Sequence, residues 1–399
     1  MVKAIKETAP IDIHSGAFEE LVKAIEEDAE ERRSKDDRLL PYKAFQLIKE
    51  ARLGAIRLPK NLGGADVTNV ELFEVIRKLA KADPDVAHAL RAHFVFVEDN
   101  LAAPSSAERT RRLQIVAKGD LVGNATTEIS SNPQGAKQYE TVLSKVGDDY
   151  VLNGTKFFTT GTLYADWVSV VSAVSAGEGD TVFVSFIPTN REGVAIYDDW
   201  DGFGQQLTAS GTTTFTNTPV KSYEAVELKR EEQSYVAIRQ LFLQAVVAGI
   251  VEAIVEDGVK LLKGRKRTFT HGSSATANED PLLLLTIGEI QATAFTLKTL
   301  IREAAQALDE ALLQGTQQSK HEAALKTVYV KVIGEQLALQ VATKLFDVGG
   351  ASATRRDQHL DRHWRNIRTI ASHNPSSYKL RDVGNYVVNG HELPINGYY

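Results

Sequence analysis

Three long segments with a helical repeat of apolar residues constrain the fold of this chain most strongly. They span residues 229–263, 282–314 and 317–347. Apolar residues recur in each at positions i, i+3, i+4 and i+7, which is typical of amphipathic helices. At 1.5 Å per residue, helices of about 30 residues reach roughly 45 Å, enough for a bundle and a subunit interface. Glycines follow each segment, and we expect left-handed caps at Gly264, Gly315 and Gly349–Gly350.

The rest of the chain divides at a change of composition near residue 119. Residues 15–118 show helical spacing of apolar residues, whereas 121–226 is rich in Val, Thr, Phe and Gly with short alternating runs. One run, Thr181–Ile187, ends at Pro188 as a strand would. The pattern predicts a mainly α member of the α+β class. Its predicted parts are an N-terminal helical domain (1–118), a central β domain (119–226) and a C-terminal helical bundle (227–399).

Composition excludes several classes of function. The 399 residues carry a net charge of −6 with acidic and basic residues intermixed, which lacks the basic footprint of a nucleic-acid-binding protein. No uninterrupted apolar run approaches the roughly 18 residues of a membrane span, and the N-terminus has no apolar signal core. We therefore expect a cytoplasmic enzyme or binding protein with neither membrane nor nucleic-acid partners.

Sulfur is almost absent from the chain, which has no cysteine and only the initiator Met1. Disulfides and cysteine-ligated metals are thereby excluded. His359 and His363 lie four residues apart, but no third ligand is evident, and we expect no metal site. The absence of sulfur is consistent with synthesis under sulfur scarcity. Low genomic usage, removal of oxidisable residues and engineering explain it equally well.

Four polar turns in the β-rich region are candidates for a cofactor site. They are Gly123–Glu128, Asn153–Gly161, Asp198–Gly204 and Thr208–Gly211. A large flat cofactor needs backbone and hydroxyl donors for its ring heteroatoms and an aromatic wall for stacking. The same residues also suit β-turns that only shape hairpins. On these residues alone, both interpretations remain open.

The order of these motifs resembles the acyl-CoA dehydrogenase superfamily. The motifs are Gly-Asn-Ala-Thr-Thr-Glu at 123–128, Asn-Gly-Thr-Lys-Phe-Phe at 153–158 and Trp-Asp-Gly-Phe-Gly at 200–204. The resemblance covers nearly the whole chain. It implies an N-terminal helical domain, a central β-barrel and a C-terminal four-helix bundle that holds a flavin, usually in a tetramer.

The C-terminal segment separates two branches of that superfamily. No glutamate occurs between Gly349 and His391, so the carboxylate base of a dehydrogenase has no obvious counterpart. Instead, Trp364–Asn366, His373–Pro375 and Ser377–Lys379 resemble the flavin-dependent (group D) monooxygenase branch, the group that contains dibenzothiophene monooxygenase.

The resemblance implies a role for particular residues. It implies catalytic roles for His373, Asn124 and Thr160 near the reactive edge of the flavin. It implies cofactor contacts for Trp200, Ser210, Thr127, Arg267 and Phe269, and a substrate side lined by His88 and Ala92. Arginine suits the FMN phosphate because its planar fork donates two charged hydrogen bonds. Histidine titrates near neutrality, so it can exchange a proton with peroxide.

Two positions depart from the branch's pattern. Asn374 replaces the aspartate that normally follows the active-site histidine, which removes a carboxylate that could orient His373. Ala92 stands where the group has a pocket tyrosine, which indicates a substrate of different shape. We therefore expect a small organosulfur compound, and not dibenzothiophene itself.

These observations together predict a two-component monooxygenase. The resemblance implies that reduced FMN, with FAD as a possible replacement, reacts with O2 to a C4a-hydroperoxyflavin that oxygenates the substrate. No Gly-x-Gly-x-x-Gly motif follows a strand, so we expect a separate NAD(P)H:flavin reductase, and we expect a homotetramer. The alternatives are an FAD-dependent acyl-CoA dehydrogenase with a displaced base, an amine N-monooxygenase and a non-enzymatic flavin-storage protein. Sulfur economy favours organosulfur oxidation, because an enzyme for sulfur acquisition would be made when sulfur is scarce.

Overall fold

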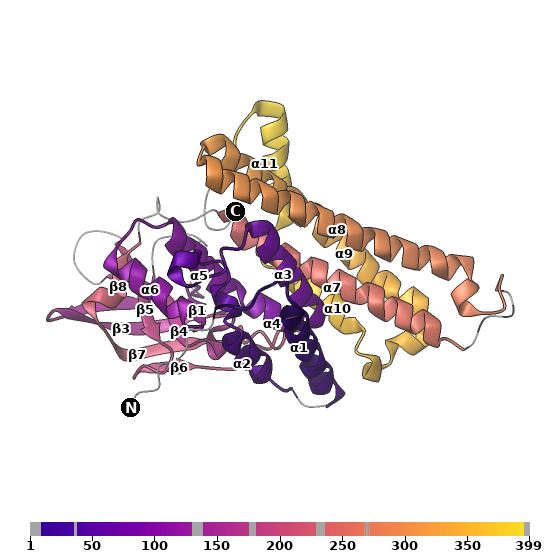
Figure 1. The fold of residues 1–399 in the computed structure, drawn as a ribbon, viewed down its shortest axis with the longest axis horizontal. Helices are drawn as coiled ribbons and strands as arrows, with labels where there is room; N and C mark the ends of the chain where they lie inside the picture. Colours follow the sequence, from indigo (N-terminus) through magenta and orange to yellow (C-terminus); the bar gives the residue numbers. More distant parts are fainter. Residues whose placement is uncertain are drawn as a thin grey trace.

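The central sheet and the helices packed on it lie at one end of the molecule, and a bundle of long helices forms the other end (Figure 1). The computed structural model describes residues 9–35, 38–129, 139–174, 181–228, 236–266, 268, 270 and 272–394. The order along the chain is helices, then strands, then helices, as the sequence predicts. The predicted fold class is confirmed. The division into domains at 118 and 226 stays a prediction.

The N-terminal helices connect the sheet to the bundle (Figure 1). They are α1 (Gly16–Ser34), α2 (Tyr42–Glu50), α3 (Asn69–Ala82), α4 (Pro84–Ala89), α5 (Arg91–Ala102) and α6 (Ala107–Ala117). Thr68 and Glu71 form a capping box that starts α3. Asp83 starts α4 by accepting hydrogen bonds from the backbone of Asp85 and Val86, and Pro84 occupies the first position, where no donor is needed. These caps fix where α4 begins, and α4 carries His88.

The central strands form one mixed sheet in the part of the chain that the structure describes. They are β1 (Val122–Ala125), β2 (Val142–Val146), β3 (Asp149–Lys156), β4 (Trp167–Val174), β5 (Val182–Pro188), β6 (Val194–Ile196), β7 (Thr213–Val220) and β8 (Ala225–Glu227). Their order is β6-β7-β3-β2-β4-β5-β8, and β1 also pairs with β4. The β1–β4 and β2–β4 pairs are parallel and the others antiparallel. The register places Asn124 of β1 opposite Ser169 of β4.

The C-terminal bundle consists of three long helices and shorter ones packed on them. The helices are α7 (Val236–Gly264), α8 (Pro281–Gln314), α9 (Gln317–Gly349), α10 (Asp361–Ala371) and α11 (Ser376–Asn389). α10 packs on both α7 and α9, and α11 packs on α9. The helix predicted at 229–263 is described from Val236 to Gly264, and residues 229–235 of that prediction lie outside the described part. Gly315 and Gly350 have positive φ as expected, but Gly264 does not, because it is the last residue of α7 itself.

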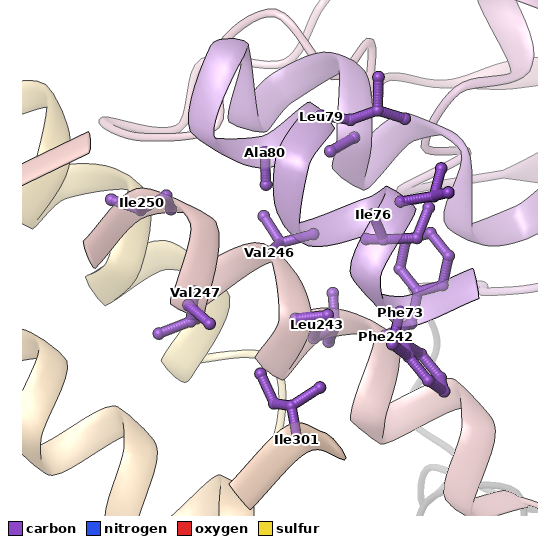
Figure 2. Packing of buried hydrophobic residues seen from close by; sticks show 14 of the residues in the cluster. Phe73, Ile76, Leu79, Ala80, Phe242, Leu243, Val246, Val247, Ile250 and Ile301 are labelled. Atoms are coloured by element: carbon purple, nitrogen blue, oxygen red, sulfur yellow. The ribbon is translucent and has the colours of Figure 1, made fainter. Parts of the chain in front are cut away.

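The main apolar core lies where α3 crosses α7 and α8. Phe73, Ile76 and Ala80 of α3 face Phe242, Leu243, Val246 and Ile250 of α7, with Ile301 of α8 beneath them (Figure 2). Gly249 lets the two helices approach, because a β-carbon there would overlap the backbone of Arg77. Among the described residues, α7 is the one helix that is long and apolar enough to span a membrane. In its most apolar stretch, 78% of the residues are buried inside the protein.

Candidate active site

His373 and Arg91 meet where the helical bundle adjoins the N-terminal helices. His373 follows the C-terminal end of α10, and Arg91 is the first residue of α5. Arg91 Nη1 lies 3.3 Å from His373 Nε2, and Arg91 Nε donates to the carbonyl of Arg239 on α7 at 2.9 Å. This contact therefore joins two residues that lie 282 positions apart in the sequence.

This contact defines the protonation state of His373. An arginine can only donate, so Nε2 of His373 must accept, which places the ring proton on Nδ1. The pKa of His373 lies well below its ordinary value because its ring is poorly hydrated and because Arg91 and His88 oppose a further positive charge. His373 is therefore a neutral proton acceptor at pH 7, although solvent still reaches it.

A second neutral histidine is held by Gln205. Nδ1 of His88 lies 2.7 Å from Oε1 of Gln205, so that nitrogen donates. Burial, aided by the charge of Arg91, lowers the pKa of His88 to about 4. The two predicted histidines thus both lie near Arg91, and both are uncharged at neutral pH.

Gln205 is the centre of the hydrogen-bond network in this region. Its backbone is left-handed (φ 52°), and its N–H donates to Oδ1 of Asn366 at 2.7 Å. Its carbonyl accepts from Nε1 of Trp200 at 3.0 Å and from Oγ1 of Thr208 at 2.8 Å. One residue thereby ties the tryptophan, a hydroxyl chain and His88 to the Trp364–Asn366 motif.

The predicted hydroxyl groups form a chain beside that network. Oγ of Ser210 lies 2.7 Å from Oγ1 of Thr160 and 2.7 Å from Oγ1 of Thr208. Gly161, with φ 78°, brings this loop onto the end of α4, because a β-carbon there would overlap the carbonyl of Ala89. The Thr160 loop is therefore held directly against the helix that carries His88.

An aromatic wall stands next to these hydroxyls. The rings of Phe158 and Trp200 meet edge to face with centroids 6.1 Å apart. Phe158 remains 51% exposed and has a left-handed backbone with φ 55°, an uncommon conformation for a bulky residue. A strained, exposed aromatic ring beside Trp200 is suited to contact a planar ligand.

Asn124 and Thr127 line the strand end nearest this loop. The carbonyl of Asn124 accepts from Oγ1 of Thr162, and that of Thr127 accepts from the N–H of Phe157. These backbone bonds fix both residues beside the Phe157–Thr162 turn. The side-chain amide of Asn124 has no hydrogen bond within the described residues, so it can bond a ligand.

Some buried side-chain polar atoms on residues of this network and its neighbours have no hydrogen-bond partner among the described residues. Within the described part of the chain, they include Nε2 of Gln205, Nε of Arg239, Oε1 of Gln240 and Oγ1 of Thr369. An unpaired buried polar atom costs about 1–3 kcal/mol. The unpaired amide Nε2 of Gln205 belongs to the network that holds Trp200 and His88, and this set of amide, hydroxyl and aromatic groups fits a flavin ring.

Other predicted site residues are less well placed or fall outside the described residues. Arg267 and Phe269, predicted to hold the phosphate, lie outside them. Their neighbours Lys266 and Thr268 line a cavity of about 760 Å³ with Gly349 and Gly350. This cavity lies at the C-terminal end of α7, whereas Arg239 beside Arg91 lies at its N-terminal end.

Ala92 follows Arg91 on α5, next to the site. No group of three potential metal ligands occurs in the described residues.

Comparison with known proteins identifies the family. The model of the acyl-CoA dehydrogenase middle domain matches residues 124–218, and that of the acyl-CoA dehydrogenase C-terminal domain matches 241–378. Dibenzothiophene monooxygenase of Mycolicibacterium goodii is 32% identical over 88% of each chain. The chain belongs to the acyl-CoA dehydrogenase family.

Two solved structures are similar over most of the chain. Dibenzothiophene monooxygenase TdsC of Paenibacillus sp. A11-2, in complex with FMN and indole, has a TM-score of 0.87 and 25% identity, covering 95% of this chain and 98% of its own. Methanesulfinate monooxygenase MsuC of Pseudomonas fluorescens has a TM-score of 0.84 and 25% identity, with the same coverage. These relatives bear out the predicted flavin-dependent monooxygenase branch.

Several residues of the site could not be found from the family motifs. Gln205 directly follows the Trp200–Gly204 motif, and Arg91 adjoins the predicted Ala92, yet neither carries a signal of its own. Phe158 lies within a motif, but its left-handed backbone is visible only in the structure. Asn366 belongs to the Trp364–Asn366 motif, and its contact with the backbone of Gln205 gives that motif a physical function.

Proposed function

We propose that this protein is a two-component, FMNH2-dependent monooxygenase that oxygenates a small organosulfur compound in sulfur acquisition. The observation that carries this proposal is the pair of neutral histidines, His88 and His373, beside a hydroxyl and aromatic shell. The reaction balances as substrate + O2 + FMNH2 giving oxygenated substrate + FMN + water. Bound reduced FMN supplies the activation of O2.

The residues of the chain have separate tasks in this proposal. Thr160, Ser210 and the amide of Asn124, which has no hydrogen bond to the described residues, would hydrogen-bond the bound flavin, and Trp200 would contact its ring. His373 accepts a proton at Nε2 when Arg91 releases that atom, and it returns the proton as water forms. Thr127 supports the turn beside the ring. Arg267 and Phe269 are proposed to hold the phosphate.

A dehydrogenase activity is poorly served by the carboxylates present. Glu335 contacts the His373–Lys379 segment through Oγ of Ser376 at 2.8 Å. It is paired with Lys331 and also accepts from Gln244 at 3.2 Å. A carboxylate that is already engaged by three donors is not free to approach a substrate α-proton.

The partners of the enzyme also belong to this proposal. A separate reductase would supply FMNH2, because the sequence has no dinucleotide-binding motif. A homotetramer is supported by large apolar side chains left exposed on α8 of the single chain, among them Leu285, Phe295 and Leu313. The cytoplasm is the proposed location, since the membrane-length helix α7 is a core element.

The test is oxygen incorporation from ¹⁸O2. The purified protein is incubated with FMN, NADH, a flavin reductase and a set of sulfides, sulfoxides and sulfinates, and products are analysed by mass spectrometry. We expect one ¹⁸O atom per product molecule. His373→Ala should lower the yield at least about 100-fold while flavin binding persists, whereas His14→Ala, at a 70% exposed side chain, should not. Unlabelled or absent products with every substrate would refute the proposal.

A further inference from the structure

We propose that Arg91 selects organosulfur anions, with small alkanesulfinates as the substrate class. This inference rests on the proposed oxygenation and specifies what its site accepts. The relatives do not decide the point, because TdsC is named for a neutral aromatic compound and MsuC for a small anion. The decision therefore depends on the residues of this chain.

Among the residues that the structure describes, Arg91 has no carboxylate partner. Its hydrogen bonds within the described residues are to the carbonyl of Arg239, through Nε, and to Nε2 of His373, through Nη1, and both acceptors are neutral. Nη2 forms no hydrogen bond or ion pair with the described residues. Poor hydration and the nearby charge of Arg239 lower the pKa of Arg91 to about 10, so it is still charged at pH 7. An uncompensated charge in such surroundings is stabilised by a bound anion.

The surroundings of Arg91 and His373 add to this positive potential. The charged groups with the strongest effect on His373 are Arg91, Lys331 and Lys379, with His88 beside them, and no carboxylate is among them. Glu335 and Asp99 each pair with a different cation, Lys331 and Arg239 respectively. The local carboxylates are thus committed elsewhere, and the charge of Arg91 remains uncompensated.

A sulfinate matches this site in geometry and in reactivity. Its two oxygens can accept from the N–H groups of one guanidinium edge. The sulfur lone pair then stays available to take up oxygen. The step forms one S–O bond: R–SO2⁻ + O2 + FMNH2 gives R–SO3⁻ + FMN + H2O. Sulfur loses two electrons, FMNH2 loses two, and O2 gains four.

Equilibrium binding tests the inference without turnover. Methanesulfinate is titrated by calorimetry into protein saturated with oxidised FMN, which cannot oxygenate it. Dimethyl sulfoxide serves as the neutral comparison, because a methyl group replaces one oxygen on the same pyramidal sulfur. We expect methanesulfinate to bind at least about 10-fold more tightly, and Arg91→Met to weaken its binding about 10- to 100-fold.

Two further variants separate charge from structure. Arg91→Lys keeps the charge but loses the fork, so its affinity for methanesulfinate should lie between those of the wild type and Arg91→Met. Arg302→Met removes an exposed arginine that forms no ion pair in the described residues and should change nothing. If Arg91→Met instead weakens FMN binding and leaves methanesulfinate binding unchanged, Arg91 serves the flavin and the inference is overturned.

Steady-state kinetics distinguish this inference from the proposed function. With the reductase present, we expect kcat/KM for methanesulfinate to exceed that for dimethyl sulfoxide, and Arg91→Met to reverse the order mainly through KM. Equal or better oxygenation of dimethyl sulfoxide by the wild type would refute the anion preference and leave the monooxygenase intact. Failure to oxygenate any organosulfur compound would refute the proposed function itself.

Discussion

The apolar core of α3, α7 and α8 and the polar site beside α5 share helix α7 but are built in opposite ways. In the core, Phe73, Phe242 and Val246 fill the space between helices that approach closely at Gly249 (Figure 2). Around His373, buried polar atoms of Gln205 and Arg239 have no partner among the described residues. The core is filled by apolar side chains, whereas the proposed site contains polar groups without a partner among the described residues.

The difference shows where stability and function are placed along α7. Its middle residues contribute burial, and its N-terminal residue Arg239 contributes a carbonyl that holds Arg91. Substitutions in the core should therefore change the free energy of unfolding more than binding. Substitutions in the site should change binding more than unfolding. Three predictions examine this contrast, beginning with the largest effect.

Phe242→Ala should destabilise the protein by about 3–5 kcal/mol, because it leaves a cavity against Phe73 and Phe94. Chemical denaturation gives the free energy of unfolding. FMN affinity of the folded fraction should stay within about 3-fold of wild type. Val146→Ala, at a 60% exposed position of β2, should change stability by less than about 0.5 kcal/mol. A large loss of FMN affinity in folded Phe242→Ala would show that core and site are not separate.

His93 provides a polar group inside the packed region, with both nitrogens satisfied. Nε2 lies 2.9 Å from the carbonyl of Gly54, and Nδ1 accepts from the N–H of Val122 at 3.1 Å. Burial lowers the pKa of His93 to about 4 from 6.5. The unfolded chain therefore binds a proton between pH 6.5 and 4 that the folded chain does not. Stability from His93 is complete above pH 6.5 and is lost as pH falls toward 4.

The expected loss is about 2 kcal/mol between pH 7 and pH 5 for this residue. Unfolding free energies of wild type and His93→Gln are compared across that range, and the variant should show a shallower decline. Other buried groups also make stability depend on pH: His88 lowers it as the pH falls, and Asp85, whose pKa burial raises to about 7, has the opposite effect. Both groups are present in the wild type and in His93→Gln, so the difference between the two proteins isolates His93. Parallel curves for the two proteins would contradict the prediction.

Asn366→Ala should weaken FMN binding about 10-fold with a loss of stability near 1 kcal/mol. The amide oxygen of Asn366 holds the backbone of Gln205, which in turn positions Trp200 and His88. Quenching of flavin fluorescence measures the affinity. Asn190→Ala, at an exposed turn, should bind FMN like the wild type. Unchanged FMN affinity in Asn366→Ala would contradict the prediction that Gln205 organises the FMN site.

The family and the elements of this fold could be predicted because their signals are local. Apolar spacing at 282–314 and 317–347 matches α8 and α9 within two residues at each end. The family resemblance named Thr160, Ser210 and His373 as site residues, but the hydrogen bond between Thr160 and Ser210 is visible only in the structure. The cap predicted at Gly264 was wrong, because helix ends depend on capping geometry that spacing does not encode.

By itself, the sequence determined the helix–sheet–helix order and the family, and it predicted the types of residue that would contact a flavin. Periodicity and short motifs are read along the chain, so they specify elements and their chemistry. Only the tertiary structure decided that Arg91 meets His373 and that Gln205 joins Trp200 to His88. Those contacts depend on how α5, α7 and α10 pack and on the left-handed backbone of Gln205, and no local pattern specifies either.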